Sequence, residues 1–202
     1  MSKGYTLTGN KKGLLFVISA PSGTGKTTLC KEILRQHPHM QLSVSCTTRP
    51  IREGELEGKD YYFINKERFR KLADEGGFAE WAEVHGELYG TTVKTLNDAE
   101  ESGVDLLLDI DWQGAKQIKK NLEKGIYIFI LPPSIEELRK RLSGRGDVSA
   151  DVMERRLKNA ATEIEQARWY NYNIINDDLE TAKKAISSIV IAEHYRSDEH
   201  DR

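Results

Sequence analysis

Residues 20–27, with the sequence Ala-Pro-Ser-Gly-Thr-Gly-Lys-Thr, have the residue types and spacing that bind a polyphosphate. Gly23 and Gly25 let the backbone come close to an anion, and successive backbone N–H groups of such a loop converge on phosphate oxygens. Lys26 adds a positive charge on a flexible side chain, and Thr27 offers a hydroxyl suited to Mg²⁺. The segment is therefore expected to be a P-loop that binds a nucleoside triphosphate.

The loop departs from the usual G-x-x-x-x-G-K-[ST] pattern at one position, where Ala20 replaces the first glycine. Alanine is tolerated there when φ is negative, so the binding mechanism is preserved. The apolar run 14–20 leads into the loop, and a helical pattern follows it without a spacer. This strand, loop and helix are the context that a P-loop requires, and an ordinary glycine-rich turn is the minor alternative.

A second phosphate site is expected in segment 45–61, where Arg49 and Arg52 stand three residues apart. The planar guanidinium group holds a phosphate monoester through two parallel hydrogen bonds, which lysine cannot do. Ser45 and Tyr61 add hydroxyls to the same segment. The alternative, which stays open, is that the two arginines form ion pairs on a solvated hairpin with the glutamates nearby, Glu53, Glu55 and Glu57.

Glu80 lies between apolar residues in the segment Phe-Ala-Glu-Trp-Ala, so we expect its carboxylate to be partly enclosed. An enclosed carboxylate needs hydrogen-bond donors, and guanine offers two side by side at N1–H and the 2-amino group. Adenine has neither, so this residue predicts a preference for guanine. Taken without its neighbours, Glu80 is an ordinary surface glutamate. We expect His85 to be a loop residue and Trp81 to belong to the core.

Asp109 and Asp111 end the apolar strand pattern LLLDID. Ligands of open α/β sheets bind at the carboxyl ends of strands, so we expect Asp109 to face the P-loop metal ion and Asp111 the acceptor. The alternative is that these aspartates cap the helix expected to start near Gln113.

Arginines also gather at the end of a predicted helix and beyond it, at Arg141, Arg145 and Arg156. The polar, glycine-bearing loop 143–151 between two basic helices has the composition of a mobile lid. Arginines that close over two nucleotides can stabilise the charge on a phosphoryl group in transfer. We expect two further arginines to form only solvated helix faces, Arg139 and Arg155.

These side chains need a framework, and the hydrophobic pattern predicts one. Near-continuous apolar runs at 104–110 and 126–131 predict buried parallel strands, and 173–176 predicts a short one. Ser134 and Glu137 form a capping box for a helix between two of these strands. Alternating strands and helices predict an α/β fold, a doubly wound parallel sheet that carries the P-loop and is flanked by helices.

Segment 45–92 interrupts this alternation and is rich in Gly, Tyr, Arg and Glu. We expect it to be a small mixed α/β insertion on a core formed by residues 12–44 and 93–194, with the lid at 143–156. A chain of 202 residues suffices for one such domain with mobile appendages.

Composition limits the partners and the compartment. The formal net charge is −2, from 30 basic and 32 acidic residues, so no global basic field favours nucleic acid or an anionic membrane. The two cysteines, Cys30 and Cys46, match no metal-ligand spacing and are expected to be buried thiols. We therefore expect a cytoplasmic protein with small-molecule substrates; its oligomeric state, a homo-oligomer included, stays open.

Taken together, the motifs resemble the guanylate kinase family, in order and spacing, from about residue 12 to 190. They are SAPSGTGKTT, SCTTRPIREGELEGKDYYF, FAEWAEVHGELYGT, LLLDIDWQG, LPPS with LRKRLSGRG, and IINDDL. The resemblance implies a nucleoside-monophosphate kinase fold with a core, a GMP-binding segment and a lid. It also implies phosphoryl transfer from ATP to GMP with Mg²⁺, in purine nucleotide metabolism, with dGMP as a further expected acceptor.

The resemblance assigns roles to particular residues. ATP is expected to contact the P-loop and one residue that lies near the ATP base. The expected ATP-binding residues are Ala20, Pro21, Ser22, Gly23, Thr24, Gly25, Lys26, Thr27, Thr28 and Asn176. At Asn176 a structural turn is a close alternative. GMP is expected to contact Ser45, Arg49, Arg52, Tyr61, Glu80, Tyr89, Thr91, Asp109 and Asp111. Catalysis is assigned to Lys26, Arg141, Arg145 and Arg156, and the metal ion to Thr27 and Asp109. The rival interpretation is a guanylate-kinase-like binding module without activity.

Overall fold

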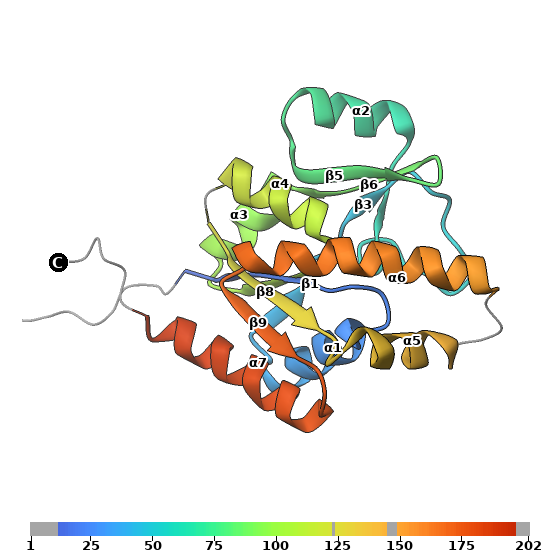
Figure 1. Ribbon diagram of the computed structural model, residues 1–202. Coiled ribbons are helices and arrows are strands. Elements are labelled where there is room, and N and C mark those ends of the chain that lie inside the picture. Colours follow the sequence, from blue (N-terminus) through green and yellow to red (C-terminus); the bar gives the residue numbers. More distant parts are fainter. Residues whose placement is uncertain (1–11, 123, 145–148, 197–202) are drawn as a thin grey trace, which may run out of the picture.

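A sheet of five parallel strands forms the centre of the molecule (Figure 1). The computed structural model describes residues 12–122, 124–144 and 149–196. In the order β2-β7-β1-β8-β9, the strands are Met40–Leu42, Asp105–Asp109, Leu15–Ser19, Ile126–Leu131 and Tyr172–Ile175. The strand that leads into the P-loop is thus central, between β7 and β8, and the predicted parallel α/β sheet is confirmed.

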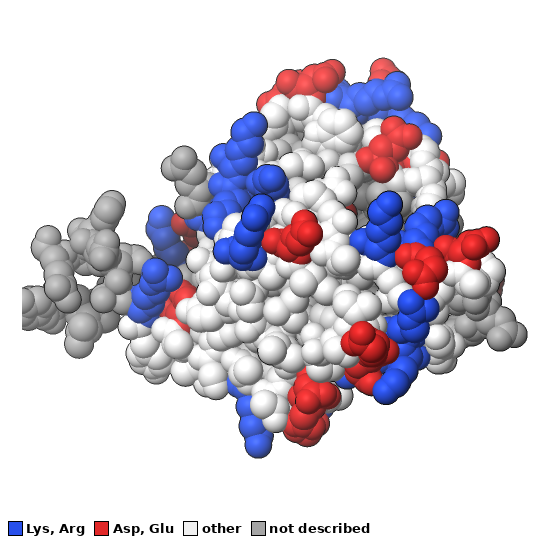
Figure 2. All heavy atoms as spheres, in the orientation of Figure 1, with Lys and Arg blue, Asp and Glu red and all other residues white. Residues whose placement is uncertain are grey.

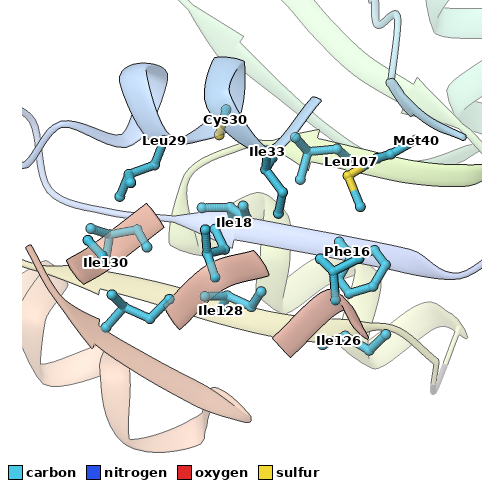
Figure 3. Close-up of a cluster of buried hydrophobic side chains, with 14 residues drawn as sticks. Phe16, Ile18, Leu29, Cys30, Ile33, Met40, Leu107, Ile126, Ile128 and Ile130 are labelled. Carbon is cyan, nitrogen blue, oxygen red and sulfur yellow. The ribbon is translucent and has the colours of Figure 1, made fainter. Parts of the chain in front are cut away.

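Helices cover both faces of this sheet, as its apolar strands require. One face packs against α1 (Lys26–Gln36) and α7 (Leu179–His194), and Phe16, Ile18 and Ile128 point toward them (Figure 3). The other face packs against α3 (Val93–Glu101), α4 (Trp112–Leu122) and the short 3₁₀ helix η1 (Glu165–Trp169). Val17, between Phe16 and Ile18, belongs to this second cluster, because successive strand side chains point to opposite faces.

Segment 45–92 forms a second, four-stranded mixed sheet of its own. In the order β4-β3-β6-β5, its strands are Tyr62–Phe63, Cys46–Thr47, Glu87–Thr92 and Phe78–Val84. The helix α2 (Lys66–Asp74) lies over β5 and β6, where Phe69 stacks on Phe78 with ring centroids 4.2 Å apart (Figure 1). This small separate core supports the interpretation of the segment as an insertion.

Two helices, α5 (Ile135–Ser143) and α6 (Ala150–Ile164), form an arm with a third apolar cluster. Its buried residues are Leu138, Leu142, Met153, Leu157 and Ala160. The predicted cap of α5 is present, since the backbone N–H of Glu137 donates to Ser134 Oγ at 3.1 Å. Of the expected lid 143–156, residues 150–156 belong to α6, and 145–148 lie outside the described residues.

Four smaller observations complete the fold. Cys30 and Cys46 are buried free thiols, as predicted. Trp81 was wrongly expected in the core: its side chain is 42% exposed, because Glu80 takes the buried face of β5 and its neighbour must face the other way. Among the described helices, none has the length and apolar character needed to cross a membrane. Figure 2 shows basic and acidic side chains interspersed around the margin of one face, with an uncharged area between them.

Candidate active site

The P-loop connects the end of β1 at Ser19 to the start of α1 at Lys26. Gly23 and Gly25 both have φ of +91°, a backbone conformation that other residues rarely adopt. Gly25 occupies the N-cap position of α1 and offers no side chain to the first turn. The N–H groups of that turn are therefore available to an anion at the positive end of the helix dipole.

Two hydrogen bonds fix the shape of the loop from inside the protein. The hydroxyl of Thr24, a fully buried residue, donates to the Pro21 carbonyl at 2.8 Å. The side chain of Asn176, which follows β9, donates through Nδ2 to the Thr24 carbonyl at 2.7 Å. A Cβ atom on Gly25 would lie 2.5 Å from that Nδ2, so glycine is required there for the approach. Asn176 thus supports the P-loop backbone, and its expected contact with the ATP base stays a prediction.

Lys26 points from the start of α1 toward the end of β7. Its Nζ lies 2.5 Å from Oδ1 of Asp109 and donates to the Ile110 carbonyl at 3.2 Å. Thr27 follows it in the exposed first turn of α1. The lysine and the aspartate that sequence reasoning assigned to the transferring phosphate and its metal ion are therefore in direct contact.

The oxygen atoms near the P-loop suit a hard cation. A hydroxyl at Thr27 and a carboxylate at Asp109 are ligand types that Mg²⁺ accepts, and this ion usually takes its remaining ligands from phosphates and water. Within the described residues, no group of three or more His, Cys, Asp or Glu side chains could hold a metal ion.

Arg49 is the centre of the second predicted phosphate site. Its guanidinium makes a two-pronged contact with Glu55, with Nη2–Oε1 at 2.8 Å and Nη1–Oε2 at 3.0 Å. It also lies over the Tyr61 ring, at 5.4 Å from the centroid, and the rings of Tyr61 and Tyr89 meet edge to face at 5.9 Å. The hydrogen bonds from Arg49 hold the pKa of Glu55 below its usual range. The structure thus brings together Arg49, Tyr61 and Tyr89.

The alternative of ion pairing is confirmed for Arg49 and Glu55, but not on a solvated hairpin, since the Arg49 side chain is only 11% exposed. Arg52 is exposed, and its backbone N–H donates to Glu55 Oε2 at 2.9 Å. Of the two predicted arginines, one is thus enclosed and oriented and the other faces solvent.

Glu80 is buried, with an exposed fraction of 7%. It faces Thr91 across the antiparallel β5–β6 pair, and the Thr91 hydroxyl donates to its Oε1 at 2.7 Å. Ser45 Oγ lies 3.3 Å from the same hydroxyl. Burial raises the pKa of Glu80, and the nearby charge of Asp111 raises it further. Glu80 and Thr91, both expected to bind guanine, therefore form one hydrogen-bonded group with Ser45, which was expected at the GMP phosphate.

Asp111 caps α4, since its Oδ1 accepts the backbone N–H groups of Gln113 at 2.9 Å and Gly114 at 2.8 Å. The capping alternative is thus correct for this residue, and its predicted contact with guanine stays a prediction. Sequence reasoning missed Gly114, which lets α4 approach Glu80: a Cβ there would lie 3.1 Å from Glu80 Oε2. It also missed Glu163 of α6, whose pKa is raised by burial and by the charge of Asp111.

The lid arginines lie on the arm formed by α5 and α6. Arg141 donates through Nη1 to the Asn176 carbonyl at 2.9 Å, which places it beside the residue that supports the P-loop. Arg156 is exposed on α6, and Arg145 lies outside the described residues. Arg139, expected on a solvated face, is half-exposed and pairs with Glu154 at 2.8 Å; Arg155 is exposed.

The carboxyl end of β7 lies between the two halves of the site, because Asp109 contacts Lys26 and the charge of Asp111 acts on Glu80. A P-loop on the central strand, an arginine and tyrosine cluster on a separate small sheet, and an arginine-bearing arm define a nucleoside-monophosphate kinase of the P-loop class. The comparisons with known proteins narrow this class. The family model described as guanylate kinase matches residues 12–193, so the chain belongs to the guanylate kinase family.

Individual relatives agree with this placement. A guanylate kinase of Geobacter metallireducens is 56% identical over 187 residues, which cover 93% of this chain and 92% of the relative. One of Geobacter sulfurreducens is 51% identical over 187 residues, with the same two shares. The crystal structure of guanylate kinase from Anaplasma phagocytophilum superposes with a TM-score of 0.70 at 40% identity, covering 93% of this chain and 89% of that one.

Proposed function

We propose that this protein transfers the γ-phosphoryl group of ATP to GMP, giving ADP and GDP, and accepts dGMP as well. The observation that carries the choice of acceptor is Glu80, a buried carboxylate next to another carboxylate rather than a cation. Such a group gains most from a ligand with two adjacent N–H donors, and guanine offers them at N1 and the 2-amino group. Adenine offers neither, so AMP leaves the buried charge without partners.

On the donor side, the backbone N–H groups of the P-loop bind the triphosphate, and Lys26 stays in contact with the γ-phosphoryl group while it is transferred. Thr27 and Asp109 would hold Mg²⁺, which neutralises phosphate charge when it is bound. Because Lys26 now pairs with Asp109, a triphosphate must draw Nζ toward its own oxygens. Asn176 keeps the loop in shape during this exchange through its contact with the Thr24 carbonyl.

On the acceptor side, Arg49 and Arg52 bind the phosphate of GMP together with the hydroxyls of Tyr61 and Tyr89. The Ser45 hydroxyl adds to this phosphate site, and Thr91 and Asp111 bind the base alongside Glu80. This division supports a core at 12–44 and 93–194, a GMP-binding segment at 45–92 and a lid at 143–156. The separate apolar clusters of the insertion and of the arm support movement of both parts against the core.

Transfer itself needs no covalent intermediate and no strong base, because the attacking group is already a phosphate anion. Catalysis then comes from alignment, from charge stabilisation and from exclusion of water. Lys26, Arg141, Arg145 and Arg156 stabilise the charge that spreads over the transferred oxygens.

The test is ADP formation from ATP and Mg²⁺ with GMP, dGMP, AMP, CMP and UMP in parallel reactions. We expect turnover with GMP and dGMP only. Binding of GMP without turnover of any acceptor would instead identify a binding module, and turnover with a different base would identify another P-loop kinase.

A further inference from the structure

Glu55 closes the loop that carries both phosphate-site arginines. Its two carboxylate oxygens accept the fork of Arg49 at 2.8 and 3.0 Å, and Oε2 also accepts the backbone N–H of Arg52 at 2.9 Å. One side chain thus receives three hydrogen bonds, two from the first residue of segment 49–55 and one from Arg52 in its middle. Removing the Glu55 carboxylate would therefore free both the Arg49 guanidinium and the backbone turn at Arg52.

The remaining contacts of Arg49 fix the plane of its guanidinium. Nη1 also donates to the Pro50 carbonyl at 2.8 Å, and the group lies over the rings of Tyr61 and Phe63, at 5.4 and 5.8 Å from their centroids. Exposure is low for both charged partners, 11% for the Arg49 side chain and 20% for Glu55. An ion pair with two matched hydrogen bonds at low exposure restrains the arginine far more than a solvated pair would.

The count of donors shows which edge of Arg49 stays available. The guanidinium has five N–H bonds. Glu55 takes one from each terminal nitrogen, and Pro50 takes the second one of Nη1. The Nε–H and the second Nη2–H are not used by these partners, and they point in parallel along the other edge. That edge is a second two-pronged donor, and the side chain of Tyr89 lies beside the same group.

We infer that Glu55 is a positioning residue for the acceptor phosphate. It remains paired with Nη1 and Nη2 of Arg49 and thereby orients the Nε–Nη2 edge toward the phosphate of GMP. This inference rests on the proposed function, because it concerns the acceptor site of that reaction. The opposite possibility is that Glu55 occupies the phosphate site and must leave it. Displacement would break all three bonds of the loop, whereas the Nε–Nη2 edge can take a phosphate without breaking any of those three.

The test compares Glu55→Gln with Glu53→Gln, which makes the same charge change at an exposed glutamate on the same loop. Affinities for GMP and for guanosine are measured by calorimetry, with thermal melting as a check on folding. Since hydrogen bonds to charged groups are strong, we expect E55Q to weaken GMP binding about 10-fold or more and to leave guanosine unchanged. E53Q should leave both affinities unchanged.

A double-mutant cycle asks whether the effect passes through the arginine. In an Arg49→Ala background, E55Q should have little further effect on GMP affinity, because its partner is gone. Unchanged or tighter GMP binding by E55Q overturns the inference, and tighter binding would identify Glu55 as a competing anion. Equal weakening of GMP and guanosine also overturns it, because Glu55 would then only maintain the fold. Wild-type turnover with GMP tests the proposed function separately: its absence overturns both, whereas an unaffected E55Q overturns the Glu55 inference alone.

Discussion

Replacement of Glu80 by glutamine tests the basis of guanine selection. Thr91 already donates to Oε1, so the amide is expected to keep its oxygen there and to place its NH₂ group at the Oε2 position. That NH₂ would then face a guanine donor, and at least one charge-assisted hydrogen bond is lost. Such a bond is worth about 1.5–3 kcal/mol, which corresponds to a fall of about 10- to 150-fold in kcat/KM for GMP.

The assay is steady-state ADP formation with GMP and with AMP, from which the ratio of the two kcat/KM values is taken. The buried charge disfavours AMP, so its removal should not lower the AMP value, and the ratio should fall by at least the factor found for GMP. Glu83→Gln, an exposed position on the same strand, is the matched control and should leave the ratio unchanged. An unchanged GMP/AMP ratio in E80Q would refute the assignment of Glu80 to guanine.

The same variant has an expected effect on stability with a defined sign. Burial raises the folded-state pKa of Glu80 above its usual value of 4.5, so the folded protein binds this proton more tightly than the unfolded chain does. Stability therefore falls as the pH rises through the window above 4.5, because a buried charge must form. Glutamine removes that cost, so E80Q should unfold at higher urea concentration than wild type at pH 7, and the difference should vanish at a pH below 4.5.

Three further variants test other parts of the site. Lys26→Ala should abolish turnover, since no other side chain follows the phosphoryl group from the P-loop; the exposed Lys31→Ala is its control, and retention of kcat would contradict this role. Arg49→Ala should raise KM for GMP much more than it lowers kcat, while Arg70→Ala on α2 should change neither; intact GMP affinity would exclude Arg49 from the acceptor site. Gly25→Ala should lose about 1–3 kcal/mol of stability from backbone strain and bind ATP more weakly, because its Cβ displaces Asn176. Gly86→Ala also has a positive φ but has open space around its Cβ, so equal ATP affinity in the two alanine variants would contradict the role of the Asn176 contact.

The parts of the fold that depend on local pattern could be predicted from the sequence. The strand Ile126–Leu131 has the expected bounds, because a buried parallel strand is apolar on both faces and ends at a proline pair. The cap of α5 could also be predicted, because its two partners lie within four residues of the sequence. The strand at 172–175 is one residue earlier than expected.

The contacts that join distant segments could not be derived in this way. Asn176 supports Thr24 across 152 positions, and only the family resemblance placed it near the nucleotide. Three glutamates at alternate positions follow Arg49, and local pattern does not distinguish them. The turn around Gly54, with φ of +86°, brings Glu55 rather than its neighbours back to the arginine. Trp81 was misplaced because its exposure depends on which face of β5 meets the site.

The central position of β1 also has a consequence for how the protein is made. β1 and its P-loop are synthesised before both neighbours of the strand, which lie beyond residue 104, and before Asn176, whose side chain anchors the loop. The insertion differs, because β3 to β6 and α2 all lie within residues 46–92. A nascent chain can therefore assemble its acceptor-side sheet while the donor-side loop is still without partners. A triphosphate that binds the P-loop therefore stabilises contacts made by segments as far along the chain as residue 176.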